Sequence, residues 1–212
     1  MEWILLAVVG GLFLAMCVAA VVTQLRNFRK LEAQMAVLAQ RFDIELTVPE
    51  ASMLGLYRRN PTLYGRYRGR ELAIYPKGYG LDNTRQTDIA IRITTRAPKS
   101  LKFTLAGQKG LDKLGQVARL KYTPTEDPEF DKAFSLRSNQ PETVAAFFDR
   151  DRRKVIEKEW GDVPGFLEVS EGCLLYLEFG LPYTDEKRLR IEHITELLCD
   201  MAEELDMLSV AS

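Results

Sequence analysis

The hydrophobic pattern changes three times along the chain, and each change predicts a different kind of element. Residues 3–22, WILLAVVGGLFLAMCVAAVV, form an uninterrupted run without a charged side chain. At about 1.5 Å per residue, a helix of this length crosses the hydrocarbon layer of a bilayer, which is roughly 30 Å thick. Residues 1–23 are therefore predicted to form a transmembrane helix.

The charges beside this run predict its direction. Arg26, Arg29 and Lys30 follow the run, whereas only the chain amine and Glu2 precede it. Positive flanking charges are retained in the cytoplasm. The expected location is therefore the cell inner membrane, with a single pass and the soluble domain in the cytoplasm.

A cleaved export signal is the main alternative for the apolar run. Such signals begin with positive charges and have an apolar core of about 7 to 15 residues, whereas this chain begins with an acid and its run is longer. A lipoprotein site at Cys17 is disfavoured because Met16 is too large for the position before the cysteine. Gly11, Ala15 and Ala19 have the four-residue spacing of a helix dimer face, although small residues are frequent in spanning helices anyway.

After the apolar run, hydrophobic residues recur every three or four positions. This spacing predicts an amphipathic helix to about Ile44, whose apolar stripe packs on the domain, because two heptads are too few for a coiled coil. Residues 24–59 are assigned to this juxtamembrane helical segment, with one further turn as a candidate at residues 53–57. The stripe consists of Phe28, Leu31, Met35, Leu38 and Phe42.

From Leu63 onward the period changes to two, which indicates β-strands. The segments LYGRY and RELAIY flank an Arg-Gly pair at positions 68–69, which predicts a tight hairpin. Apolar residues alternate again over 89–93 and 101–105 and predict a second hairpin with one buried face. LEV and LLYLEF predict a third hairpin across the Glu-Gly pair at 171–172.

Helical spacing returns in the last third of the chain, after a short strand around Phe134. Asn139 and Glu142 form a capping-box pattern, so a helix is expected to start there and to run to about Trp160. Another helix is expected to begin at Thr184. Its inward stripe is Leu189, Ile194, Leu197, Leu198, Met201 and Leu205. This order predicts an α+β domain over residues 60–212, with a mainly antiparallel sheet and packed helices.

Composition argues against some classes of function. The 29 basic and 30 acidic residues give a net charge of -1, whereas a nucleic-acid partner requires a clear basic excess. Cys17, Cys173 and Cys199 are odd in number and far apart, which matches neither a disulfide framework nor a zinc site. A reducing compartment is the simpler interpretation.

No segment carries a catalytic or cofactor-binding signature. The single histidine, His193, has no acid, serine or cysteine at a useful spacing, and no glycine run resembles a phosphate-binding loop. A cluster of acids lacks the glycine and the last glutamate of a calcium loop and is interpreted as a solvated turn; it comprises Glu126, Asp127, Glu129 and Asp131. No cofactor or metal is therefore expected, and catalysis is uncertain and disfavoured.

Arginines interleaved with tyrosines around the first hairpin form a candidate binding site. Residues 24–80 carry ten basic and five acidic side chains, so the part nearest the membrane segment in sequence is positive. Anionic lipid attracts each such cation by about 1 kcal/mol, and guanidinium groups also hold phosphates and carboxylates. The simpler and preferred interpretation is that these side chains face water and stack on tyrosines. The candidates for anion or lipid contact are Arg58, Arg59, Arg66, Arg68 and Arg70.

Three segments of the chain carry a resemblance, PTLYGRYRGRELAIY, PEFDKAFSLRSNQPE and FLEVSEGCLLYLEFG. From residue 60 to the end, the sequence resembles a group of uncharacterised bacterial membrane-anchored proteins, which carry a hairpin of the form YxGxYRGR and a segment FDxxFxxxSNxPE. The resemblance implies membrane association and a domain of unknown function, with no catalytic residue to carry over. The matching positions Phe130, Asp131, Phe134, Ser138, Asn139 and Pro141 are all explained as core, turn and cap.

These features favour a non-enzymatic interaction or assembly module at the cytoplasmic membrane face. Its expected partners are the lipid bilayer and either another protein or a second copy of the chain. One alternative is an enzyme with a site of scattered acids, tyrosines and arginines, which a deep pocket with a perturbed carboxylate would favour. The other is a sensor of anionic lipid or a small anion that uses the arginines.

Overall fold

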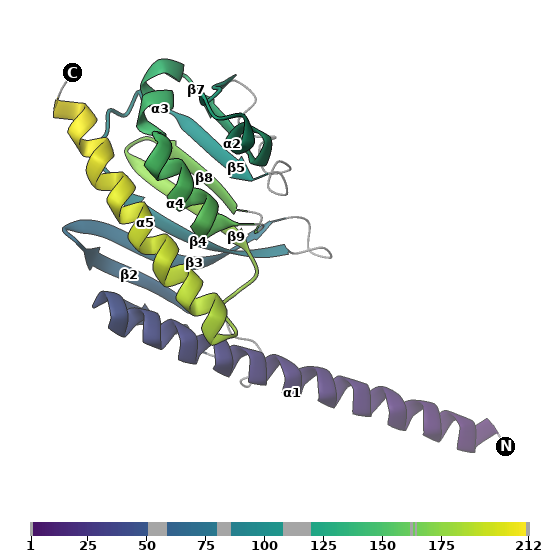
Figure 1. Ribbon diagram of the computed structural model, residues 1–212. Helices are drawn as coiled ribbons and strands as arrows, with labels where there is room; N and C mark the ends of the chain where they lie inside the picture. Colours follow the sequence, from purple (N-terminus) through teal and green to yellow (C-terminus); the bar gives the residue numbers. More distant parts are fainter. Residues whose placement is uncertain are drawn as a thin grey trace.

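The structure is a computed structural model that describes residues 2–50, 59–79, 86–107, 120–161, 163 and 165–210. These residues form a nine-stranded sheet, helices packed on it and one long N-terminal helix (Figure 1). The α+β class and the mainly antiparallel sheet predicted from the sequence are confirmed. The candidate turn at residues 53–57 lies outside the described residues.

All neighbouring strands of the sheet pair antiparallel. Their order is β1-β2-β3-β4-β9-β8-β5-β7-β6. The strands are β1 (Glu45–Thr47), β2 (Thr62–Tyr67), β3 (Arg70–Tyr79), β4 (Gln86–Thr94), β5 (Phe103–Gly107), β6 (Lys121–Tyr122), β7 (Phe134–Ser138), β8 (Gly165–Ser170) and β9 (Cys173–Phe179).

Two of the three predicted hairpins are confirmed, β2–β3 and β8–β9. Each turn has two residues with positive φ, Arg68 at 50° with Gly69 at 75°, and Glu171 at 51° with Gly172 at 75°. Two successive positive φ values match the right-handed twist of the strands that they join. A glycine in the second position accepts this conformation without a Cβ clash.

The predicted second hairpin is wrong, because β4 and β5 are not neighbours. The β8–β9 hairpin lies between them, with Ile91 of β4 opposite Tyr176 of β9 and Leu105 of β5 opposite Leu167 of β8. The chain between β4 and β5 passes the turn of this hairpin, where the N–H of Thr95 donates to the carbonyl of Gly172 over 2.9 Å. Alternation shows which face of a strand is buried, but it does not identify the neighbouring strand.

The helix predicted from Asn139 to Trp160 is two helices. Phe147 and Phe148 both contact Phe103, at ring distances of 6.1 and 5.6 Å. In one continuous helix, the side chains of two successive residues would point about 100° apart and would not both face Phe103. The helix therefore ends at Phe147. The helices are α1 (Glu2–Phe42), α2 (Pro128–Ala133), α3 (Pro141–Phe147), α4 (Arg150–Trp160) and α5 (Asp185–Val210).

The predicted capping box is also wrong. The side chain of Asn139 accepts from the N–H of Lys102 over 2.8 Å and donates to the carbonyl of Ser100 over 2.7 Å. It therefore links the segment after β7 to the segment before β5. Gln140 occupies the N-cap of α3 without a side-chain cap. The second helix has its own cap, Asp149, which accepts from the N–H of Arg152 over 2.9 Å.

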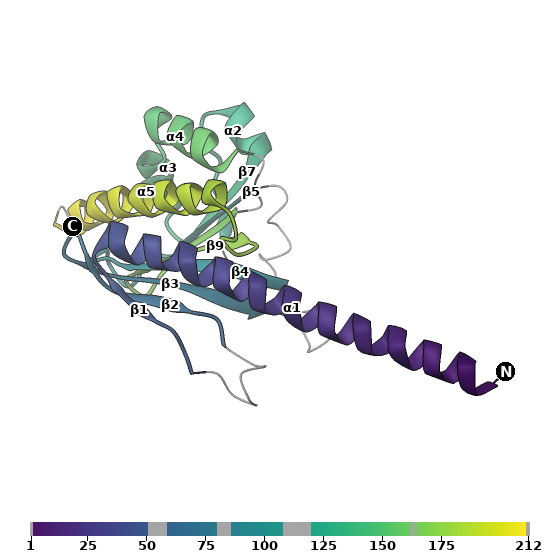
Figure 2. The ribbon, with the colours of Figure 1, turned by 90° about the horizontal axis from the view of Figure 1, so that it is seen from below.

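Helix α5 lies across one face of the sheet, beside α4 and next to the C-terminal part of α1 (Figures 1 and 2). Its predicted start at Thr184 is confirmed, because the Thr184 hydroxyl accepts from the N–H of Lys187. Five of the six residues predicted for its inward stripe are buried. The exception is Leu189, which is 44% exposed, while Ile191 is buried instead.

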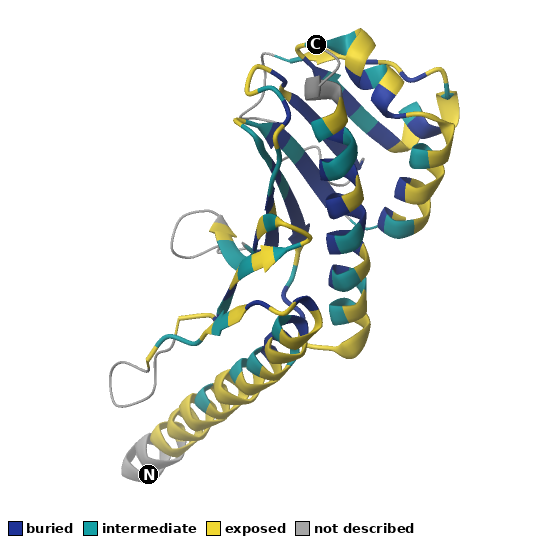
Figure 3. Ribbon diagram, turned by 90° about the vertical axis from the view of Figure 1, so that its left-hand side faces the viewer, coloured by how far each residue is buried: buried dark blue, intermediate teal, exposed yellow. Residues whose placement is uncertain are grey.

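Helix α1 has two environments along its length (Figure 3). From Val9 to Ala20 every side chain is exposed, and within the described residues α1 is the one helix long and apolar enough to cross a membrane. From Leu31 to Phe42 the predicted stripe enters the main hydrophobic core, and Leu31, Met35, Leu38 and Phe42 are at most 1% exposed. The helix ends two residues before the predicted limit and is compatible with a single-pass membrane anchor.

Candidate functional site

The turn of the β2–β3 hairpin is held to the acidic side of α5 by ion pairs. Arg68 pairs with Asp200 and Glu203 at 2.8 Å each, and it approaches Glu196 at 3.4 Å. Burial by itself would lower the pKa of the Arg68 guanidinium, but Asp200 and Glu203 outweigh burial and raise it. The guanidinium therefore joins the hairpin to α5.

One of these acids, Glu196, also contacts the end of α1. Glu196 accepts from Tyr67 over 2.8 Å and pairs with Arg41 at 3.1 Å. The ring of Tyr67 packs edge-on against Phe42, with centroids 4.9 Å apart. The C-terminal end of α1, the hairpin turn and α5 are thereby joined at one corner of the domain.

Arg70 makes a separate contact with α5, because it pairs with Asp206 at 2.8 Å. Asp206 also accepts from the Thr95 hydroxyl over 2.7 Å and from the N–H of Arg96 over 2.6 Å. Burial by itself would raise the pKa of the Asp206 carboxyl, but these hydrogen bonds outweigh burial and lower it. Asp206 therefore stays ionised and ties α5 to β3 and to the end of β4.

The five candidate arginines are not held in one place. Arg58 lies outside the described residues, and Arg59 is exposed at the start of β2. Arg66 is exposed and lines a cavity of about 320 Å³ together with Arg70 and Arg96. Anion or lipid contact at these positions stays a prediction.

Geometry separates most of these arginines from the membrane segment. Residues 22–42 of α1 span about 30 Å, and Tyr67 packs beside Phe42 at the far end of that length. Arg68 and Arg70 therefore lie a long way from the apolar run, next to the acids of α5. Arg59, by contrast, adjoins Asn60, which lies beside the first turns of α1 after the run.

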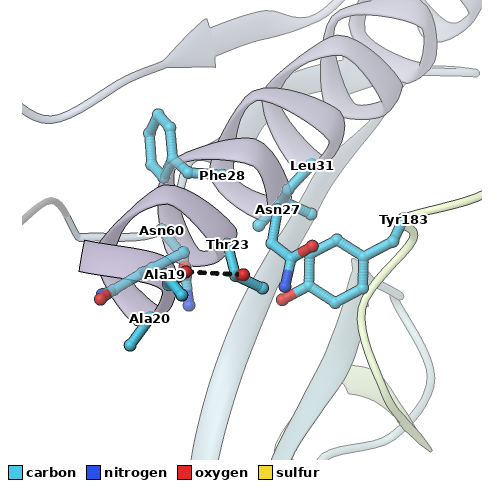
Figure 4. A pocket seen from close by; sticks show the side chains of 9 residues that line it. Ala19, Ala20, Thr23, Asn27, Phe28, Leu31, Asn60 and Tyr183 are labelled. Atoms are coloured by element: carbon cyan, nitrogen blue, oxygen red, sulfur yellow. Dashed lines mark hydrogen bonds between the residues drawn. The ribbon is translucent and has the colours of Figure 1, made fainter. Parts of the chain in front are cut away.

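A groove at this second location is the most distinctive hollow near the anchor (Figure 4). Its volume is about 600 Å³. It is formed by one side of α1, by Asn60 two residues before β2, and by the connection between β9 and α5. The lining residues are Ala19, Ala20, Thr23, Gln24, Asn27, Phe28, Leu31, Asn60 and Tyr183.

One wall of the groove is continuous with the hydrophobic core. Leu31 is 1% exposed, and Gln34, one turn further along, donates to Asp185 over 3.1 Å, which holds the start of α5 against α1. Tyr183 points toward Asn27 (Figure 4). Burial raises the pKa of the Tyr183 phenol, so its hydroxyl remains protonated and can donate a hydrogen bond.

One buried ionic cluster joins β9 to α5. Glu178, only 1% exposed, accepts from Lys187, from Arg190 at 2.9 Å and from the Tyr176 hydroxyl at 2.6 Å. Arg190 also donates to the carbonyls of Glu159 and Trp160 at the end of α4. Lys187 and Arg190 thus pair with the buried carboxylate of Glu178. A buried charge requires such partners, because it has lost its contact with water.

The remaining candidates have local explanations. His193 is 65% exposed and lies 3.6 Å from Glu159. All three cysteines are free, and burial raises the pKa of Cys199 to about 12, so its thiol is unreactive.

The acidic cluster is not only a solvated turn, because two of its four members are structural. Asp127 caps α2, and Asp131 accepts from the N–H and hydroxyl of Thr125. Glu126 and Glu129 are exposed. Among the described residues there is no group of three or more His, Cys, Asp or Glu side chains arranged to hold a metal ion.

Comparisons with known proteins show a shared fold. No family model matches the chain, and no curated protein matches it. The crystal structure of the mycobacterial trehalose monomycolate transport factor A, TtfA, superposes with a TM-score of 0.50 and 12% sequence identity. The superposition covers 80% of this chain and 95% of the other. At this identity, the likeness extends to the fold alone.

Sequence reasoning missed both the groove and the partners of Arg68. The groove combines residues that are far apart in the sequence, so no local pattern marks it. The acids had a visible signal, because Glu196, Asp200 and Glu203 recur at helical spacing on one side of α5. Such a stripe indicates a surface that a basic segment can cover.

Proposed function

We propose that this chain is a non-enzymatic, single-pass membrane protein that holds its domain in a fixed orientation at the cytoplasmic face, as an interaction or assembly module. The observation that carries the proposal is the continuity of α1, which runs unbroken from Glu2 to Phe42. From Val9 to Ala20 it is exposed, and from Leu31 to Phe42 its apolar stripe lies in the domain core. Because one helix both crosses the membrane and packs in the domain core, no flexible linker separates the anchor from the domain.

A fixed orientation favours an assembly role over a freely diffusing activity. A tethered enzyme that acts on soluble substrates needs only to be near the membrane, whereas a module that contacts other membrane proteins must present one face at one height. The ion pair of Arg41 with Glu196 also joins the end of α1 to α5, and Arg68 joins the β2–β3 hairpin to the same helix. The charged side chains at this corner of the domain thereby hold α1, the β2–β3 hairpin and α5 together.

The structural neighbour suggests a setting for this module. TtfA is a mycobacterial trehalose monomycolate transport factor. We infer by analogy of fold that the present chain serves as an accessory protein of a membrane-bound transport assembly. Its partner is then a membrane protein of that assembly or a second copy of the chain.

Insertion of two alanines after Leu25 is expected to abolish co-purification of the partner from detergent-solubilised native membranes. Two extra helical residues turn the domain by about 200° around α1 and raise it by only about 3 Å, so the partner-binding face would point away. The measurement is affinity purification of the full-length chain followed by mass spectrometry of retained membrane proteins.

The matched control is insertion of the same two alanines after Glu2, which leaves the domain unchanged relative to the bilayer. This variant should retain the partner. Retention by both variants, or a partner-free monomer from native membranes, would contradict the proposed function.

A further inference from the structure

We propose that the groove beside α1 binds the headgroup of a membrane lipid that is uncharged and rich in hydroxyl groups, a glycolipid. The inference rests on the proposed function, because it requires α1 to span a bilayer. It assigns a ligand class to the nine residues that line the groove (Figure 4).

The position of the groove places it at lipid headgroups. The headgroup layer extends about 5 to 7 Å beyond the hydrocarbon on each side of a bilayer. Thr23 directly follows the apolar run, and Asn27 is about 6 Å further along the helix axis. Ala19 and Ala20 lie below them, at the level of the acyl chains. One end of the groove therefore faces hydrocarbon and the other faces headgroups, which is the polarity profile of a lipid.

The chemistry of the lining selects an uncharged headgroup. Among the described residues, its polar members are two asparagines, one glutamine, one threonine and one tyrosine, and none of the nine that line it is charged. Amides and hydroxyls both donate and accept hydrogen bonds, as sugar hydroxyls do. A phosphate only accepts, and it is usually bound by cationic donors. The basic side chains Arg26, Arg29 and Lys30 follow the run but do not line the groove.

Individual contacts support this assignment. The Thr23 hydroxyl donates to the carbonyl of Ala19 over 2.8 Å, so its oxygen remains available as an acceptor. The raised pKa of Tyr183 keeps its phenol as a donor, and the amides of Asn27 and Asn60 flank the same space (Figure 4). The ring of Tyr183 offers an apolar surface to the C–H face of a sugar.

The size of the groove also fits. Ligand sites in proteins commonly measure about 300 to 1,000 Å³, and this groove measures about 600 Å³. That volume holds a sugar headgroup with the first part of its lipid. The groove is built against Leu31, which lies in the core.

Native mass spectrometry of the full-length chain in mild detergent tests the proposal. The probes are monoglucosyl diacylglycerol and phosphatidylglycerol with the same acyl chains. The unmodified chain should retain the glycolipid in preference to the anionic lipid. Replacing both Asn27→Leu and Asn60→Leu should lower glycolipid retention by about tenfold, because two hydrogen bonds to the headgroup are lost.

The matched control is Gln40→Leu, which makes a similar amide-to-leucine change at an exposed position of α1 outside the groove. This variant should bind like the unmodified chain, and near-UV circular dichroism should show native packing in all of them. Equal retention of both lipids, preference for phosphatidylglycerol, or unchanged glycolipid binding by the Asn27→Leu, Asn60→Leu variant would overturn the proposal. A groove filled instead by a helix of a protein partner would give no glycolipid retention and would overturn it too.

The insertion experiment separates this inference from the proposed function. If glycolipid binding fails but the insertion after Leu25 still removes the partner, the assembly role stands and only the ligand assignment falls. If the insertion has no effect and no partner is retained, the assembly role itself falls.

Discussion

Removal of residues 1–43 is expected to abolish cooperative folding of the remaining chain, whereas removal of residues 1–22 is expected to leave it folded. The longer deletion removes the four side chains of α1 that lie in the core, from Leu31 to Phe42. Full burial of such side chains contributes about 1.5 to 3 kcal/mol each. Their sum, about 6 to 12 kcal/mol, is comparable with the whole stability of a typical domain, about 5 to 15 kcal/mol.

The shorter deletion removes only residues whose described side chains are exposed or, in the case of Val21, half-buried. Both truncated chains can be compared by near-UV circular dichroism and by thermal unfolding. The chain of residues 23–212 should show a sharp transition, and the chain of residues 44–212 should show none. A cooperative transition in the longer deletion would mean that the predicted boundary at residue 60 is a true domain boundary and that α1 only rests on the surface.

Glu178→Ala is expected to be the most damaging single substitution among the ion pairs. The change leaves Lys187 and Arg190 largely buried without their carboxylate, with side chains 20% and 22% exposed. Removal of one partner from a buried ion pair costs about 3 to 5 kcal/mol. For a protein of this size, that loss lowers the melting temperature by roughly 10 °C. Thermal unfolding of the full-length chain in detergent measures this shift.

Two controls separate the buried charge from a general effect of losing a glutamate. Glu171→Ala removes a carboxylate that is 68% exposed and pairs with Lys102, and it should leave the melting temperature unchanged. In a chain that already carries Lys187→Met and Arg190→Met, Glu178→Ala should have a much smaller effect, because no buried cation remains. Equal losses in both backgrounds would show that packing of Glu178, and not its charge, is responsible.

Local signals in the sequence were sufficient for some elements of the fold. The two hairpins with an Arg-Gly or Glu-Gly turn depend on residues next to one another, and both are present. The stripe from Phe28 to Phe42 was predicted to pack on the domain, because its spacing follows one face of a helix. Its members from Leu31 onward lie in the core, whereas Phe28 is half-buried. The boundaries of α1 could be predicted to within two residues at its C-terminal end.

Other elements depend on residues far away in the chain. The neighbours of β4 and β5 are set by the β8–β9 hairpin, which begins at Gly165, far beyond the end of β5 at Gly107. The break between α3 and α4 follows from the burial of Phe147 and Phe148 against Phe103. The groove requires α1, Asn60 and Tyr183 to meet. None of these combinations has a periodic signal, so they could not be predicted from a single sequence.

The arginines illustrate the same limit. Their closeness to the apolar run in sequence suggested a surface near the bilayer. The chain does return to the first turns of α1 at Asn60, but β2 then runs to the far end of that helix, where Tyr67 packs on Phe42. Arg68 and Arg70 meet the acids of α5 there, so nearness in sequence was a poor guide to nearness to the membrane.

The most direct test of the central claim is a distance measurement across α1 in a lipid bilayer. Spin labels at Met16, in the apolar run, and at His193, on the exposed side of α5, report whether the anchor and the domain move together. With the full-length chain in lipid nanodiscs, double electron–electron resonance should give a single narrow distance distribution. A broad distribution, or a chain that does not enter the nanodisc, would contradict a domain held rigidly by its membrane helix.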